Sequence, residues 1–160
     1  MADWSVRKSF SQLLLKLFGY AVKRTNDKYD MREVQQKYYL QKGKTVQLDI
    51  NDMDFKRVFY IEDGHTQMVE PQDVDHIDCT IAMSAQTVVD IINGESSRMM
   101  PNGSWGKIPY DPKVAWSLSE ITVDQASYWL SDGQYFINTF LKELLPEIRE
   151  ALGGKMPRIQ

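Results

Sequence analysis

The sequence predicts an α+β fold, with a mostly antiparallel or mixed sheet of about five strands that is covered on one face by helices. Three observations lead to this fold class. Apolar residues recur at helical spacing near both ends of the chain, short stretches of alternating apolar and polar residues fill the middle, and turn residues separate these stretches. The 160 residues suit one domain, and we expect a single domain over 1–160 with an N-terminal helical segment at 9–42.

The first helix is predicted to begin after Ser9, a residue type that favours the N-cap. Apolar side chains follow it at the i, i+3, i+4 and i+7 spacing of a helix that faces a core. They are Phe10, Leu13, Leu14, Leu17, Phe18, Ala21 and Val22. The pattern weakens over residues 25–43, which indicates a second, less buried helix that ends at Gly43.

Three strands are expected next in the chain. Apolar and polar residues alternate over 46–50, and the turn residues Asn51 and Asp52 follow. Residues 55–61 and 65–70 flank an Asp-Gly pair, which favours the two-residue turn of a β-hairpin.

A further strand passes directly into a helix. Side chains alternate most clearly over 77–84, which is the period of a half-buried strand. Ser84 can cap the helix that follows, and Gly94 stands where a helix commonly ends. The tight junction places this helix directly beside the sheet.

The remaining residues are predicted to form a loop and three further elements. Residues 95–111 hold two prolines, two glycines and no periodicity, so one long loop is expected. Asp111 and Pro112 start a short helix, and residues 121–123 alternate as a last strand. A closing helix over 134–154 carries one apolar stripe and is expected to kink near Pro146.

The composition excludes several classes of protein. The 19 Lys and Arg against 22 Asp and Glu give a net charge of -3, so no global positive field attracts nucleic acid. Cys79 is the only cysteine, which excludes an intrachain disulfide and a cysteine-rich metal cage. No apolar run approaches the ~20 residues of a membrane span. The N-terminal apolar residues follow helical spacing, so we expect no signal peptide and a cytoplasmic protein.

No catalytic residue, metal site or cofactor is expected. His65 and His76 have no second histidine at ligand spacing, and a group of aspartates near them lacks the glycine and terminal glutamate of a calcium loop. Cys79 lies on the apolar face of its predicted strand, where a free cysteine usually acts as a small hydrophobic residue. Phosphate-binding and nucleophile motifs do not occur, so we expect a protein that is not an enzyme.

Three segments carry a resemblance to a known family. They are the hairpin VFYIEDG with the alternating strand DCTIAMS, the helix closed by glycine AQTVVDIINGE, and the proline-started helix and strand PKVAWSLSEITV. In this order, from Val58 to Leu145, they resemble the sterol carrier protein family. The chain departs from the family pattern in a longer loop at 95–111 and a longer turn at 127–133, both where the ligand tunnel of that fold would open.

The resemblance implies a sterol-carrier-like domain with a cavity between the sheet and the helices. We therefore expect non-enzymatic binding or transfer of a lipid, such as a fatty-acyl, sterol or isoprenoid-like ligand. The predicted ligand-binding residues are Phe59, Ile61, Ile81, Met83, Met99, Met100, Trp105, Trp116, Phe136 and Phe140. The alternative for each of them is an ordinary place in the core.

Two questions stay open from the sequence. The apolar residues of the predicted loop, Met99, Met100 and Trp105, either form a lid or membrane-touching tip or fold back over the sheet edge. The alternative to lipid binding is a protein-interaction or scaffold subunit, whose apolar groove takes a partner or a second copy. Transient membrane contact and a homodimer are compatible with either function.

Overall fold

A five-stranded mixed sheet lies at the centre of the structure, which is a computed structural model that describes residues 4–38, 45–99, 101–124, 146–147 and 149–150. The strand order is β3-β2-β1-β4-β7. The strands are β1 (Val46–Ile50), β2 (Phe55–Glu62), β3 (His65–Val69), β4 (Cys79–Met83) and β7 (Ile121–Val123). Only the β1–β4 pair of this sheet is parallel.

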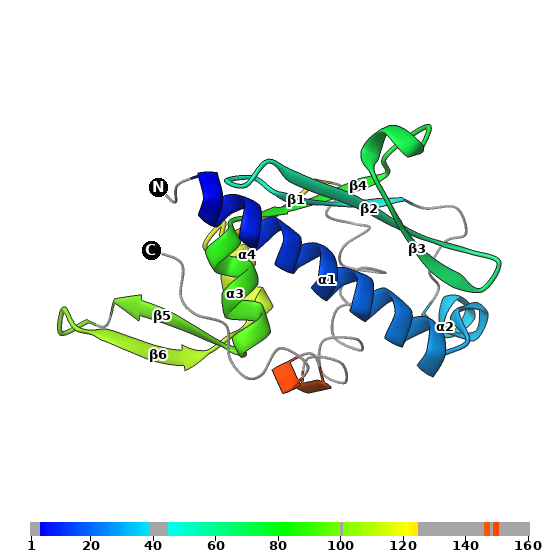
Figure 1. The fold of residues 1–160 in the computed structure, drawn as a ribbon. Helices are drawn as coiled ribbons and strands as arrows, with labels where there is room; N and C mark the ends of the chain where they lie inside the picture. Colours follow the sequence, from blue (N-terminus) through cyan, green and yellow to red (C-terminus); the bar gives the residue numbers. More distant parts are fainter. Residues whose placement is uncertain (1–3, 39–44, 100, 125–145, 148, 151–160) are drawn as a thin grey trace.

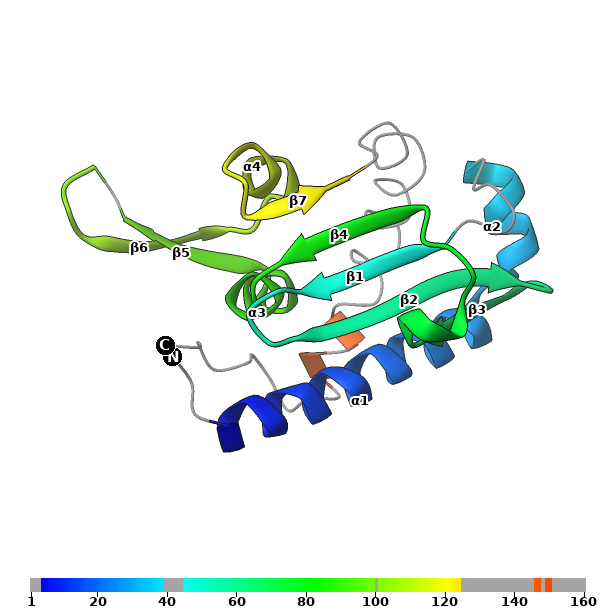
Figure 2. The ribbon, with the colours of Figure 1, turned by 90° about the horizontal axis from the view of Figure 1, so that it is seen from above.

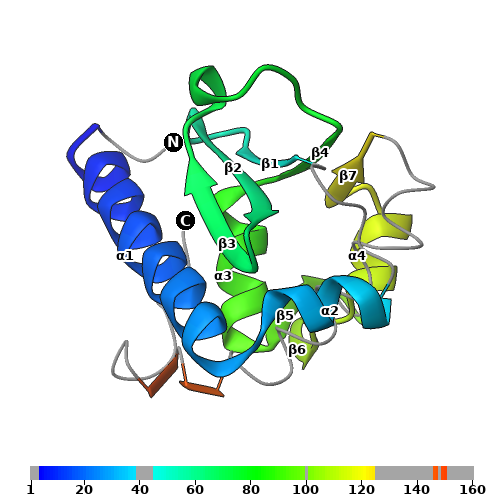
Figure 3. The same cartoon turned by 90° about the vertical axis from the view of Figure 1, so that its right-hand side faces the viewer.

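Most of the α-helices lie on one side of the sheet (Figures 1 and 3). They are α1 (Trp4–Lys28), α3 (Ala85–Asn93) and the shorter α4 (Pro112–Ser117), with α2 (Met31–Tyr38) at the end of α1. The short 3-10 helix η1 (Pro71–Asp73) lies on the opposite side. The predicted fold class, an α+β domain with helices over one face of a mixed sheet, is therefore confirmed.

Most of the predicted elements in the middle of the chain are confirmed. The β2–β3 turn holds Asp63 at φ 51° and Gly64 at φ 78°, as a two-residue hairpin turn requires. The Ser84 hydroxyl accepts the Thr87 N–H at the start of α3, and Gly94 ends that helix in the left-handed conformation. Most of the predicted kinked helix over 134–154 lies outside the described residues. Its described residues, 146–147 and 149–150, are helical.

The first helix is longer than predicted. It begins at Trp4 and continues through Ser9, so Ser9 is not its N-cap, and it ends at Lys28. A serine is tolerated inside a helix whose apolar face is buried, because burial outweighs a preference of a few tenths of a kcal/mol. The second helix begins after Asp30, whose carboxylate accepts the Arg32 N–H at 3.0 Å.

The predicted long loop at 95–111 is wrong, because this segment forms a β-hairpin. Strands β5 (Glu95–Met99) and β6 (Trp105–Pro109) pair antiparallel and project from the body of the molecule (Figure 2). Its prolines fit because one stands in the turn and the other at the end of an edge strand. The two strands pair through their backbones. Their sequences lack the alternation of apolar and polar side chains by which a half-buried strand is recognised, so the sequence did not predict them.

Candidate ligand site on the inner face of the sheet

One face of the five-stranded sheet is almost entirely apolar. Residues directly opposite each other in neighbouring strands share a face, and successive residues of one strand alternate between faces. We call this face the inner face. Its residues are Val46, Leu48, Ile50, Phe55, Arg57, Phe59, Ile61, Thr66, Met68, Cys79, Ile81, Met83, Ile121 and Val123.

Helix α1 packs against the inner face through an aromatic contact. The ring of Phe18 lies 6.1 Å from that of Phe55 and 6.0 Å from that of Phe59, measured between centroids. Leu14 and Leu17 of the same helix are buried in one cluster with inner-face residues of β1, β2, β4 and β7. The helices and the inner face thus enclose a continuous apolar layer.

Four of the predicted ligand-binding residues lie together on this face. Phe59 and Ile61 project from β2, and Ile81 and Met83 project from β4, on either side of β1. Ile81 and Met83 belong to the buried cluster, and Ile61 packs against it. Whether a ligand contacts them is a prediction that stays open.

The other predicted residues that the structure describes lie away from this face. Trp105 is 60% exposed on β6, and its cross-strand partner Met99 ends β5, so both belong to the projecting hairpin. Trp116 lies on α4 and is 36% exposed. The remaining three, Met100, Phe136 and Phe140, lie outside the described residues.

Arg57 is a polar member of the inner face that the sequence analysis missed. It stands between Phe55 and Phe59 in β2, its guanidinium lies 4.8 Å from the centre of the Phe55 ring, and its side chain is 19% exposed. Its Nη2 is 3.7 Å from an oxygen of Glu70, and its Nη1 donates to the Lys56 carbonyl. The alternating spacing of Phe55, Arg57 and Phe59 could have revealed it.

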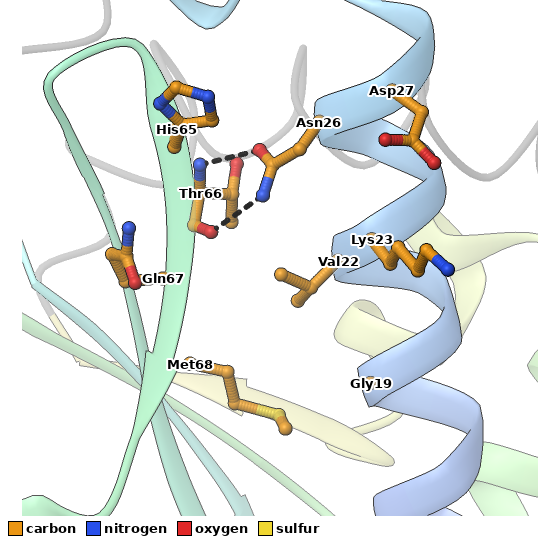
Figure 4. Close-up of a pocket in the computed structure, with 9 residues that line it drawn as sticks. All are labelled: Gly19, Val22, Lys23, Asn26, Asp27, His65, Thr66, Gln67 and Met68. Atoms are coloured by element: carbon orange, nitrogen blue, oxygen red, sulfur yellow. Dashed lines mark hydrogen bonds between the residues drawn. The ribbon is translucent and has the colours of Figure 1, made fainter.

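A groove opens at the border of the inner face, between α1 and β3 (Figure 4). Its volume is about 440 Å³. The lining residues are Gly19, Val22, Lys23, Asn26 and Asp27 of α1, and His65, Thr66, Gln67 and Met68 of β3. The sequence does not reveal this groove either, because its two walls are about forty residues apart in the chain and neither carries a motif.

Asn26 bridges one end of the groove. Its side-chain carbonyl accepts the Thr66 N–H at 2.7 Å, and its amide NH₂ donates to the Thr66 carbonyl at 3.0 Å (Figure 4). The side chain therefore bonds to β3 as a neighbouring strand would. The Thr66 hydroxyl oxygen is buried and has no hydrogen-bond partner within the described part of the chain.

The one cysteine is held in its neutral form. Burial, followed by the nearby carboxylates of Asp124 and Asp78, raises the pKa of the Cys79 thiol to about 11. The sulfur lies 3.4 Å from the Asp124 carbonyl oxygen, to which the thiol donates. Because the thiolate is the nucleophilic form, Cys79 is poorly suited to covalent chemistry at neutral pH.

Two residues near the C-terminus connect α1 with α3. Arg24 donates to the Glu147 carboxylate at 2.9 Å, and this hydrogen bond is the main reason that the pKa of Glu147 lies below its usual value. Arg149 donates to the Ile92 carbonyl at 2.6 Å, near the end of α3. Glu147 thus contacts α1, and Arg149 contacts α3.

The described residues hold neither a cluster suited to a metal ion nor a helix suited to a membrane. Among those that the structure describes, no three His, Cys, Asp or Glu side chains lie close enough together to hold a metal ion. No described helix combines the length and the apolar character needed to cross a membrane.

Comparison with known proteins identifies the family. A profile of the SCP-2 sterol transfer family matches residues 22–103, which is just over half of the chain. This chain belongs to the SCP-2 sterol transfer family. The predicted family is therefore confirmed, although the matched segment begins in α1 and ends in the β5–β6 turn, whereas the residues that suggested it run from 58 to 145.

Solved structures also resemble this chain, and one of them covers most of its length. It is described as a UbiJ-SCP2 ubiquinone synthesis protein, with 13% sequence identity and a TM-score of 0.47 over 82% of this chain and 96% of that chain. No curated protein matches this chain. Family membership thus associates the chain with proteins that bind and transfer lipids, and it names no individual ligand.

Proposed function

We propose that this protein binds a lipid or another long apolar ligand against the inner face of the sheet and releases it chemically unchanged. The observation that carries the proposal is the continuous apolar layer between that face and α1 in a member of a sterol transfer family. A fatty-acyl or isoprenoid-like chain suits this layer, because each methylene removed from water contributes roughly 0.8 kcal/mol.

Arg57 supports a ligand with a polar or anionic end. Its guanidinium borders the apolar layer while part of it reaches solvent, and arginine binds carboxylate and phosphate groups through paired hydrogen bonds. A ligand chain could then lie along Phe59 and Ile61 with its head group near Arg57. The ligand-binding residues predicted on β2 and β4 are consistent with this arrangement.

The projecting hairpin supports transfer rather than storage alone. Trp105 exposes most of its side chain, and the turn residues 101–104 are exposed beside it. Tryptophan partitions well into the interface of a bilayer. We infer that the hairpin contacts a membrane transiently while a ligand enters or leaves, and that the protein works without a catalytic step in the cytoplasm.

Native mass spectrometry of the purified protein, followed by extraction of any bound molecule, tests the proposal. We expect about one lipid per chain. Phe59→Asp should abolish binding of a fluorescent fatty acid, because it places a charge on the inner face. Tyr60→Asp is the matched control, because the neighbouring side chain is also half-buried but lies on the opposite face.

Full retention of fatty-acid binding by a folded Phe59→Asp protein would contradict the proposal. The second candidate function is an interaction or scaffold subunit, which the groove between α1 and β3 favours. Its expected mark is a copurifying protein together with a lipid-free mass of the chain.

A further inference from the structure

Strand β3 is an edge strand whose outward backbone groups are only partly occupied. Thr66 directs its N–H and C=O away from β2, because both bond to Asn26 of α1. In an antiparallel pair this direction alternates along the strand. Met68 therefore also directs its N–H and C=O away from β2, as does Glu70, whose N–H donates to the Asp73 carboxylate at 3.2 Å.

Met68 thus presents a free donor and a free acceptor to the groove. Within the residues that the structure describes, nothing bonds to its outward N–H or C=O. Figure 4 shows Met68 beyond the Asn26–Thr66 bridge, with Gly19 and Val22 on the opposite wall. An open strand edge of this kind can pair with a further strand.

Gly19 keeps the groove wide at this level. A Cβ atom added to Gly19 would meet nothing within 4 Å. Glycine inside a helix lowers stability by roughly 0.5–1 kcal/mol relative to alanine, so neither helix formation nor a tight contact explains this residue. Its effect is to leave space opposite Met68.

We propose that an extended segment of a partner protein docks between α1 and β3 and adds to the sheet as a strand at Met68. One residue of the segment would accept the Met68 N–H and donate to the Met68 carbonyl. A residue opposite Met68 shares its face, so its side chain would point between Gly19 and Val22. We therefore expect an apolar residue at that position, with polar neighbours on both sides.

Other occupants satisfy the groove less well. A hydrocarbon chain offers nothing to the Met68 N–H and C=O. A second copy of the sheet cannot pair edge to edge here, because α1 lies alongside β3 (Figure 3). A single extended strand would lie ~4.8 Å from β3, the spacing of neighbouring strands, and strand addition is a common mode of peptide recognition.

The probe is a displayed library of random twelve-residue linear peptides, selected on the full-length protein, with the enriched sequences then synthesised. Met68→Pro removes the outward N–H while the bonds between β2 and β3 stay, and proline is tolerated on edge strands in this orientation. It should weaken peptide binding by about tenfold or more relative to Met68→Ala.

A second pair of variants tests the space in the groove. Gly19→Phe should block the peptide, whereas Gly19→Ala should keep its affinity within about threefold. The backbone nitrogens of the peptide are then methylated one at a time. Methylation should abolish binding at the residue that donates to the Met68 carbonyl and should be tolerated at the residues on either side of it. Circular dichroism and lipid occupancy by native mass spectrometry verify that each variant is folded and report separately on the inner face.

The proposal is overturned if no enriched peptide distinguishes Met68→Pro from Met68→Ala, or if Gly19→Phe binds the peptides as the wild type does. The same holds if peptides bind but tolerate methylation at every backbone nitrogen. A wild-type protein that binds the peptides but carries no lipid would instead contradict the proposed lipid function alone.

Discussion

The five-stranded sheet and the β5–β6 hairpin use the same backbone pairing with opposite consequences for their side chains. The inner face of the sheet is buried under α1, and four predicted site residues meet on it. The hairpin projects from the body and exposes Trp105. A strand is therefore recognisable from its sequence when one of its faces is buried, whereas backbone pairing alone leaves no such pattern.

The largest expected difference between the two regions is in stability. Ile50 is fully buried on the inner face, so Ile50→Ala should lower the free energy of unfolding by about 2–5 kcal/mol. Ile108 of the hairpin is half-buried, and Ile108→Ala should lower it by less than about 1 kcal/mol. Urea denaturation followed by circular dichroism measures both, and equal losses would show that the hairpin belongs to the same core.

The bridge between Asn26 and Thr66 gives the next largest effect. Asn26→Ala removes two hydrogen bonds from the outer edge of β3, and we expect a loss of about 1–2 kcal/mol in the free energy of unfolding. The hairpin offers the contrasting case, because Asn102→Ala disturbs only an exposed turn, where its carbonyl accepts the Ser104 N–H. Hydrogen exchange at Thr66 should accelerate in the first variant only.

The sheet and the groove beside it show which features of the fold and the site can be predicted from the sequence. The β2–β3 turn, the Ser84 cap and the inner-face residues of β4 follow from local chemistry and period, and the structure agrees. The groove could not be foreseen, because it depends on α1 lying along the edge of β3. The place of Arg57 on the inner face could have been predicted, because it stands between Phe55 and Phe59 at the two-residue spacing of one strand face.

Trp105 allows a test of function that should leave stability unchanged. Trp105→Ala should alter the free energy of unfolding by no more than about 0.5 kcal/mol, because the side chain is mostly exposed. If the hairpin touches membranes, this variant should slow lipid transfer between vesicles several-fold and keep the equilibrium affinity for lipid. An unchanged transfer rate would remove the hairpin from the proposed mechanism. Leu118→Ala, at another mostly exposed apolar residue, is the control on the body of the molecule.

The smallest expected effect concerns the ion pair that fixes α1. The pKa of Glu147 is lowered in the folded protein, chiefly by the hydrogen bond from Arg24 and further by the positive charges of Arg24 and Lys28. A lowered pKa means that this contribution is complete above the ordinary glutamate pKa of ~4.3 and is lost as the pH falls through the folded value.

Glu147→Gln should therefore lower the melting temperature slightly at pH 7, and its difference from the wild type should vanish in acid. The pair is exposed to solvent and screened by salt, so we expect a shift of about one degree. In the hairpin, Lys107→Ala removes the ion pair with Glu95, whose side-chain atoms are 3.5 Å apart. Because the Lys107 side chain is 72% exposed, we expect a still smaller shift, and a larger one would couple the hairpin to the core.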